Sequence, residues 1–372
     1  MKSYLICLFS LSCLLLLINH TAAQEPLPHL VQPGDSWTTL AWRFNTSTAA
    51  LQTLNPHLNS QRQPTIGDTI LRPPTEERSG TLLRERSDPL LLIALRQQQN
   101  PWQFAQQNGL AHPYRPLFGQ PLFIERGDIP PRDLPAQFTT LELSAIPAYP
   151  GEGVPTRGPP SADLPPTTLT LGSSTGNLFQ NGRRAVGLIG TGAFFRPGAP
   201  ELTLQTADGL LWSQPWRVSA DKQWTFNQIT LSGTAAEITQ DAIEAERERL
   251  FELWNQATPL PQWQTTFQEP VTEYLEYSSF YGARRSYNGG PYRTYHEGLD
   301  FAAFGGTEVY APAAGTVIVA ELLYVRGGAV IIDHGLGIYS GVYHMSEVLV
   351  SAGDAVNSGQ LVGKVGTTGF ST

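Results

Sequence analysis

The residues best suited to chemistry lie near the C-terminal end of the chain. The protein has seven histidines, and three of them fall between positions 296 and 344. His296 and Asp300 are four residues apart, which places the two side chains on one face of either a helix or an extended strand. Imidazole nitrogen and carboxylate oxygen together suit zinc. Taken alone, however, a His-x3-Asp pair is a weak signal for a metal site.

A helical zinc motif is the rival interpretation of this segment, because Glu297 follows His296 as in the HExxH motif of other metallopeptidases. Position 300 holds Asp where that motif needs a second His. Gly298 and the Gly305-Gly306 pair also disfavour a helix. We therefore do not assign Glu297 as a general base.

The surrounding sequence predicts short strands joined by glycine turns, which indicates an antiparallel sheet. The segments that carry this pattern are Ala311-Pro312-Ala313 to Gly315, Ile331-Ile332-Asp333-His334-Gly335, Tyr343-His344 and Gly366-Thr367-Thr368-Gly369. In this order, with the His-x3-Asp pair before them, they resemble the M23 family of peptidoglycan metalloendopeptidases, also called the lysostaphin or LytM type. The resemblance covers residues 258–372 and is close from about residue 292 onward.

The resemblance implies zinc-dependent hydrolysis of peptide bonds in the stem or cross-bridge of peptidoglycan. Carried over by position, His296 and Asp300 would be ligands of Zn2+, and His344 would be a catalytic histidine near the metal. His334 lies in a hairpin turn of the family pattern, which favours a structural role over a ligand role.

The family also expects a Gly-Pro-His-x-His segment, which would supply another catalytic histidine and the third zinc ligand. The sequence stops at Thr372, where that segment would begin. We expect that the sequence is an incomplete record of a longer chain, with a naturally shortened, inactive relative as the alternative. With His296 and Asp300 as its zinc ligands, the chain as given is expected to bind little zinc and to show little activity.

Residues 29–73 predict a small strand–helix–helix–strand unit. The segments 29–36, 51–56 and 66–70 resemble the opening, the middle and the close of a LysM domain. That family binds N-acetylglucosamine glycans of peptidoglycan or chitin, through the loop after the first strand and the loop between the second helix and the second strand. A small structural module without a ligand is the alternative. Residues 79–124 repeat the pattern weakly and are interpreted as a degenerate LysM-like copy.

Between these units and the C-terminal region, residues 137–232 alternate in strand fashion and predict a β-sandwich spacer of immunoglobulin-like type. Residues 235–257 predict an amphipathic helix, interpreted as a packing helix or stalk. The expected fold is therefore multidomain and mainly β. It combines small βααβ LysM modules, a β-sandwich spacer and a C-terminal antiparallel β-sheet metallopeptidase domain over 258–372 that is incomplete at its end.

Residues 1–23 predict a signal peptide, with an uncleaved membrane anchor as the rival interpretation. Both cysteines, Cys7 and Cys13, lie in that segment, so neither a disulfide nor a thiolate metal site is expected in the processed chain. A formal net charge of −8 gives no general attraction to nucleic acid. We expect a secreted or cell-envelope protein that associates with the cell wall and has no stable membrane span after signal cleavage.

Two functions of different class remain open. The first is a secreted zinc endopeptidase that is bound to peptidoglycan through LysM. The second is a non-catalytic regulator or scaffold of other wall hydrolases, because some family members have lost zinc ligands. The presence of His296, Asp300 and His344 favours the enzyme. Continuing the open reading frame past codon 372 discriminates between them, since a natural stop codon there would contradict the hydrolase.

Overall fold

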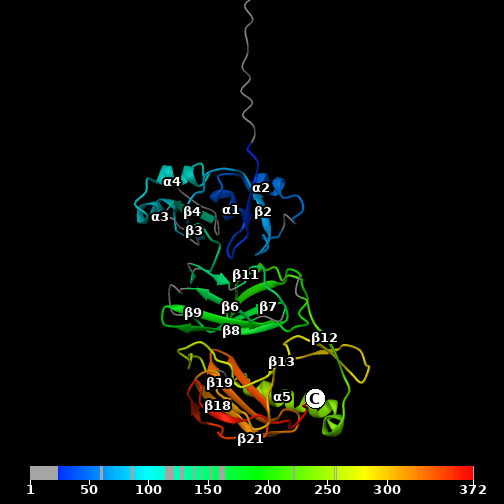
Figure 1. Cartoon of the computed structure of the whole chain (residues 1–372). Helices are drawn as coiled ribbons and strands as arrows, with labels where there is room; N and C mark the ends of the chain where they lie inside the picture. Colours follow the sequence, from blue (N-terminus) through cyan, green and yellow to red (C-terminus); the bar gives the residue numbers. More distant parts are fainter. Residues whose placement is uncertain are drawn as a thin grey trace, which may run out of the picture.

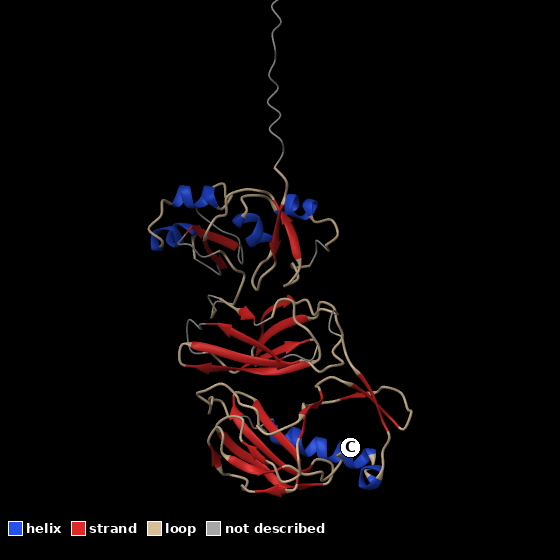
Figure 2. Ribbon diagram, viewed as in Figure 1, coloured by secondary structure: helices blue, strands red, loops and turns tan. Residues whose placement is uncertain are grey.

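A computed structural model of the chain describes residues 24–58, 62–84, 88–113, 121–125, 130–135, 137–138, 140–143, 145–150, 153–158, 164–220, 223–254, 256 and 258–371. The predicted signal peptide, residues 1–23, lies outside the described residues. The rest is arranged in three tiers, with two small α/β units at one end, a β-sheet in the middle and a second β-rich region at the other end (Figure 1). Strands dominate the lower two tiers, as expected for a mainly β protein (Figure 2). Within the part of the chain that is described, we find no helix with both the length and the apolar character needed to cross a membrane.

The first small unit has the predicted strand–helix–helix–strand order. Its elements are β1 (Leu27–Leu30), α1 (Trp37–Arg43), α2 (Thr48–Leu54) and β2 (Thr69–Arg72), and β1 pairs antiparallel with β2. Ser36 begins α1 through a capping box with Thr39, which satisfies amide groups that the first turn leaves unpaired. Leu40, Phe44 and Leu51 are fully buried between the helices and the strand pair.

The second small unit repeats this order. Its elements are β3 (Gly80–Arg84), α3 (Leu90–Arg96), α4 (Pro101–Gln107) and β4 (Pro121–Glu125). Asn55 in the first unit and Asn108 in the second follow the second helix, and each makes the same three contacts. Each side-chain amide donates to a carbonyl of that helix and to a carbonyl of the last strand, and each side-chain oxygen accepts from the amide of that same strand residue. The units also pack together, because Trp42 stacks on Phe123 with ring centroids 4.8 Å apart.

The middle tier is one antiparallel sheet of seven strands in the order β11-β10-β7-β8-β9-β6-β5. These strands are β5 (Glu142–Leu143), β6 (Gly153–Gly158), β7 (Thr167–Leu171), β8 (Ser174–Asn181), β9 (Arg184–Gly190), β10 (Glu201–Thr206) and β11 (Gly209–Pro215). The region is β-rich as predicted, but the two separately bonded sheets of an immunoglobulin-like sandwich are replaced by a single sheet that curls around its own core. Gly187 of β9 permits the curl, because a Cβ there would lie 2.1 Å from the side chain of Leu169 on β7.

The boundary predicted for the spacer at residue 232 needs correction. Strand β12 (Phe226–Ile229) pairs in parallel with β14 (Arg284–Tyr287), and therefore belongs to the C-terminal sheet system. Sequence alternation reveals that a strand exists but does not reveal its partner, which here lies almost sixty residues further along the chain.

The helix predicted over 235–257 is divided. A 3-10 helix, η1 (Gly233–Glu237), comes first, and α5 (Gln240–Trp254) follows. Ile238 separates them because its backbone is extended, with φ −75° and ψ 117°. Leu250 of α5 is fully buried against the apolar face of the C-terminal sheet, so α5 is a packing helix.

The C-terminal region is built mainly from short antiparallel strands, as predicted, with β12 and β14 as a parallel pair. Strand β13 (Glu276–Ser279) precedes β14 in the chain. The strands that follow β14 are β15 (Thr294–Tyr295), β16 (Asp300–Ala302), β17 (Glu308–Tyr310), β18 (Gly315–Leu323), β19 (Gly327–Gly335), β20 (Ile338–Met345), β21 (Glu347–Val348), β22 (Ala355–Val356) and β23 (Leu361–Lys364). The main sheet has the order β20-β19-β18-β22, and β19 is buried along its whole length. His344, one of the predicted site residues, lies on β20 of this sheet.

Candidate active site

Strand pairing brings His296 and Asp300 together. His296 directly follows β15, where its amide donates to the carbonyl of Ala283 and its carbonyl accepts from the amide of Gly282, both at 2.8 Å. Asp300 begins β16 and lies opposite Ser279, the last residue of β13. The result is a distance of 3.0 Å between His296 Nε2 and Asp300 Oδ1. The nitrogen and the oxygen that sequence analysis selected as ligands therefore converge, from extended backbone rather than from a helix.

A second layer of polar groups holds this pair. Ser279 Oγ lies 3.0 Å from His296 Nδ1, and both residues are buried. The Arg285 guanidinium approaches both Ser279 Oγ and Asp300 Oδ2 through Nη2, at 3.5 and 3.4 Å. A hydrogen bond to one ring nitrogen of a histidine fixes the ring orientation and leaves the other nitrogen for a metal. Ser279 and Arg285 therefore orient the predicted ligands.

The charge around Asp300 favours its ionised form. Burial is the largest single influence and raises the pKa of this carboxyl. The hydrogen bond with His296 and the electrostatic interactions with His296, Arg285 and His344 act in the opposite direction, and together they lower the pKa below its ordinary value. The carboxylate is thus ionised at neutral pH, which is the form that binds a cation.

His344 lies near the end of β20 in a backbone conformation that few side chains adopt. Its φ is +61°, in the left-handed region that is uncommon for residues other than glycine. Its amide donates to the carbonyl of Arg326 at 2.9 Å, and its ring Nδ1 lies 2.7 Å from the carbonyl oxygen of Thr368. A carbonyl only accepts, so Nδ1 carries the proton and Nε2 of the neutral ring is left with its lone pair. Strained residues of this kind cluster at functional sites.

The two residues judged less suitable for chemistry are engaged elsewhere. Glu297 is exposed and forms an ion pair with Arg247 of α5. His334 is fully buried, with Nδ1 2.8 Å from the carbonyl oxygen of Ala314 and Nε2 2.8 Å from Ser340 Oγ. Burial lowers the pKa of His334, so its ring is neutral. Both ring nitrogens have partners within the protein, which agrees with the predicted structural role.

His296 and Asp300 are chemically suitable as two ligands of a zinc ion. His296 Nε2 and Asp300 Oδ1 are a nitrogen and an ionised oxygen donor that approach each other, as ligands of one ion must. Among the residues that the structure describes, no group of three His, Cys, Asp or Glu side chains could hold a metal ion. A catalytic zinc site uses three protein ligands, of which this pair could supply two.

Three supporting residues escaped the sequence analysis: Ser279, Arg285 and Thr368. Ser279 lies 17 positions before the histidine that it contacts, and Thr368 lies 24 positions after its own. No short motif links such pairs, because they meet only through strand pairing and loop packing. The Gly366-Thr367-Thr368-Gly369 segment was noted as part of the family pattern, but its sequence did not indicate that a backbone carbonyl orients His344.

Comparison with known proteins agrees with the two resemblances. The family model described as Peptidase family M23 matches residues 294–372, and the model described as LysM domain matches residues 29–73. The chain thus contains an M23 peptidase region and a LysM domain.

Individual relatives match over part of the chain. An uncharacterized metalloprotease of Haemophilus influenzae is 41% identical over 80 residues, which are 21% of this chain and 16% of that protein. The peptidoglycan DD-endopeptidase ShyA of Vibrio cholerae is 35% identical over 107 residues, 28% of this chain and 25% of that protein. A Pseudomonas aeruginosa crystal structure assigned to peptidase M23 is 26% identical, with a TM-score of 0.42, covering 61% of this chain and 86% of that one. The chain thus spans only about a sixth to a quarter of the length of these two curated relatives.

Proposed function

We propose that the protein is an exported zinc endopeptidase that hydrolyses peptide bonds in peptidoglycan and attaches to the wall through its LysM domain. The observation that carries the proposal is the 3.0 Å approach of His296 Nε2 to Asp300 Oδ1 within the M23 region. The similarity to a peptidoglycan endopeptidase over 107 residues supports the substrate class.

The proposed metal is zinc, held by His296 and Asp300. When bound, zinc supplies Lewis-acid chemistry and lowers the pKa of a water ligand to about 7. His296 can bind the metal through Nε2 only if the proton of the neutral ring lies on Nδ1. There the Ser279 hydroxyl oxygen accepts a hydrogen bond from Nδ1. Arg285 then steadies the hydroxyl and the second carboxylate oxygen. Because a third ligand is needed for tight binding, the chain as given is proposed to hold zinc weakly.

His344 is proposed as the proton carrier. Its Nε2 lone pair is free to take a proton, because Nδ1 is already committed to the Thr368 carbonyl. After protonation the ring is an imidazolium, which can donate to the leaving amine or stabilise negative charge on the former carbonyl oxygen. The left-handed backbone at this residue fixes where the ring lies.

The test follows zinc binding and peptide release together. Purified peptidoglycan is incubated with the product of the reading frame continued past codon 372, and released peptides are separated by chromatography. His296→Ala is expected to abolish both zinc binding and release, whereas His344→Ala is expected to abolish release and retain zinc. Gln205→Ala, an exposed residue on β10 outside both the site and the LysM domain, is the control and is expected to leave zinc binding and release unchanged. Zinc retention and full activity in His296→Ala would contradict the proposal.

A further inference from the structure

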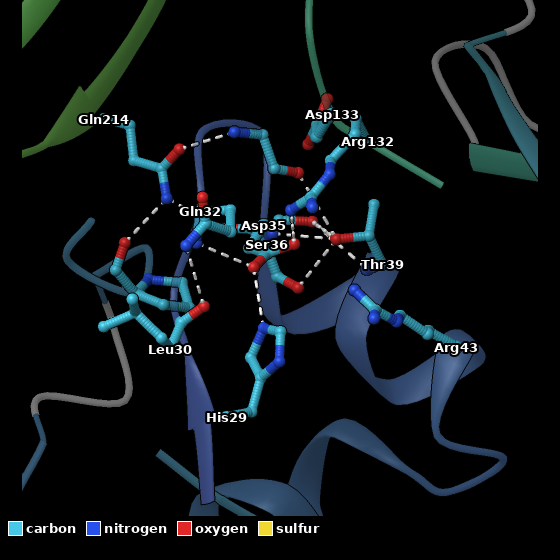
Figure 3. A network of polar contacts seen from close by, with 12 residues as sticks. His29, Leu30, Gln32, Asp35, Ser36, Thr39, Arg43, Arg132, Asp133 and Gln214 are labelled. Carbon is cyan, nitrogen blue, oxygen red and sulfur yellow. Dashed lines mark hydrogen bonds and ion pairs between the residues drawn. The ribbon is translucent and has the colours of Figure 1, made fainter. Parts of the chain in front are cut away.

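The two LysM loops that the family resemblance assigns to glycan binding lie against the middle sheet of the same chain. One loop follows β1 and contains Gly34 and Asp35. The other precedes β2 and contains Pro64, Ile66 and Asp68. Figure 3 shows Arg132, Asp133 and Gln214, which come from outside the LysM domain, close to the first loop. The inference developed below rests on the proposed glycan binding by this domain.

Gln214, on β11 of the middle sheet, binds both loops at once. Its Oε1 accepts from the amide of Gly34 at 2.8 Å. Its Nε2 donates to the carbonyl of Asp35 at 2.9 Å and to the carbonyl of Pro64 at 2.8 Å (Figure 3 shows the side chain beside the first loop). The Gln214 side chain is only 2% exposed, so water does not replace these bonds. A side chain from 180 positions along the chain thus satisfies backbone groups of both loops.

The second loop also joins the middle tier through its backbone. The amide of Ile66 donates to the carbonyl of Pro215, and the amide of Arg217 donates to the carbonyl of Ile66, both at 2.8 Å. This forms a parallel bridge between Ile66 and Trp216. The Ile66 side chain is fully buried in the core of the middle tier rather than in that of the LysM domain. At the exposed edge of this contact, Arg217 forms an ion pair with Asp68 of the second loop.

The linker before the middle sheet covers the first loop from another side. The amide of Asp133 donates to the carbonyl of Gly34 at 2.7 Å, and Arg132 forms an ion pair with the buried carboxylate of Asp35. The Leu134 side chain also packs directly against Gly34, because a Cβ added to Gly34 would lie only 2.9 Å from it. Figure 3 shows Arg132 and Gln214 approaching the loop together.

From these contacts we propose that the middle tier and the glycan compete for the same loops, so that the structure shows a closed, glycan-excluding state of the LysM domain. Sugar hydroxyl and acetamide groups would need the loop amides and carbonyls that Gln214, Pro215, Arg217 and Asp133 already bind. Glycan binding therefore requires these contacts to open. The apparent Kd for glycan equals the intrinsic Kd divided by the fraction of molecules that are open, and any change that weakens the closed state lowers the apparent Kd.

The experiment measures binding of chitohexaose to the purified chain by calorimetry. Gln214→Ala removes three hydrogen bonds from the closed state, and Arg217→Ala removes only the ion pair with Asp68. We expect Gln214→Ala to tighten binding about tenfold or more, and Arg217→Ala to tighten it by a smaller factor. Gln205→Ala, an exposed glutamine on the neighbouring strand β10, is the matched control and is expected to leave the Kd unchanged. Thermal unfolding of each variant checks that it is folded. If Gln214→Ala does not fold, the milder variant Arg217→Ala still tests the proposal.

A second readout follows the contact itself. Competition predicts that saturating chitohexaose speeds amide hydrogen exchange at Ile66 and Arg217 in the unmodified chain, because the bonds from the Ile66 amide to the Pro215 carbonyl and from the Arg217 amide to the Ile66 carbonyl open. Equal glycan affinity in all four proteins, or slower exchange at these amides on binding, would overturn the competition while leaving glycan binding intact. Binding by none of the proteins would instead refute the glycan-binding role of the LysM domain, and the competition with it.

Discussion

Glu246 of α5 is expected to hold the turn that fixes His344, and its removal gives a large and measurable effect. The carboxylate is buried and accepts three hydrogen bonds from the turn between β18 and β19. Val325 donates its amide at 2.8 Å, and Arg326 donates its amide at 3.2 Å and its guanidinium at 3.0 Å. The same turn carries the Arg326 carbonyl that accepts from the His344 amide. Helix and site are thus coupled through one side chain.

The size of the effect follows from what each substitution leaves unpaired. Glu246→Ala leaves two backbone amides and the Arg326 guanidinium, which is only 16% exposed, without their acceptor. Breaking such a buried ion pair costs about 3–5 kcal/mol of unfolding free energy. Glu246→Gln keeps one accepting oxygen but places an NH2 group among donors, so we expect a loss of about 1–3 kcal/mol. Glu248→Gln, exposed on the same helix, is the control and should change stability by less than about 0.5 kcal/mol.

The assay is urea unfolding of the C-terminal transition, combined with hydrogen exchange at the amides of Val325 and His344. Exchange at both amides is expected to speed up in Glu246→Ala and to be unchanged in Glu248→Gln. If Glu246→Ala costs less than about 1 kcal/mol, the carboxylate does not anchor the turn. A full loss of stability with no change at the His344 amide would separate the helix contact from the site and refute the coupling.

Three further predictions concern the residue that orients His296, the pH dependence of stability, and the two small α/β units at the N-terminal end. Ser279→Ala should weaken zinc binding by His296 about 10–100-fold, measured by competition with a chromogenic chelator, whereas Ser279→Thr, which keeps the hydroxyl, should retain most of the affinity. Because burial lowers the pKa of His334 in the folded state, its contribution to stability is complete above the unfolded pKa of about 6.5 and is lost as pH falls from there towards the folded pKa. Thermal unfolding between pH 7.5 and 5 should therefore show a decline, at most about 1.4 kcal/mol per pH unit from this group, and His334→Gln should flatten it. Asn55→Ala and Asn108→Ala should each destabilise its own unit by about 1–3 kcal/mol in urea unfolding, and an unequal effect in which one costs nothing would show that the matching contacts are not equivalent in energy.

Much of the organisation could be predicted from local sequence alone. The LysM unit over 29–73 and the strand-rich region before Thr372 follow from turn residues, helix caps and apolar alternation, which act over a few positions. The approach of His296 to Asp300 was predictable for the same reason, since the two residues are only four positions apart and reach one side of an extended segment. The rejection of Glu297 as a base was likewise a matter of local pattern, and the structure places that side chain in an ion pair with α5.

The remainder depends on partners that no local pattern specifies. Strand β12 joined the C-terminal sheet because Phe226–Ile229 pairs with Arg284–Tyr287, and the middle strands form one curled sheet because small residues let distant strands approach. The residues that orient the site could not be predicted from sequence for the same reason, since Ser279 and Thr368 contact His296 and His344 only through strand pairing and loop packing. Sequence by itself therefore determined which atoms could bind a metal and which modules exist, because those properties reside in short segments. Only the tertiary structure decided how the site is oriented and that Gln214 covers the LysM loops, because hydrogen-bonding groups find such distant partners only once the whole chain has packed.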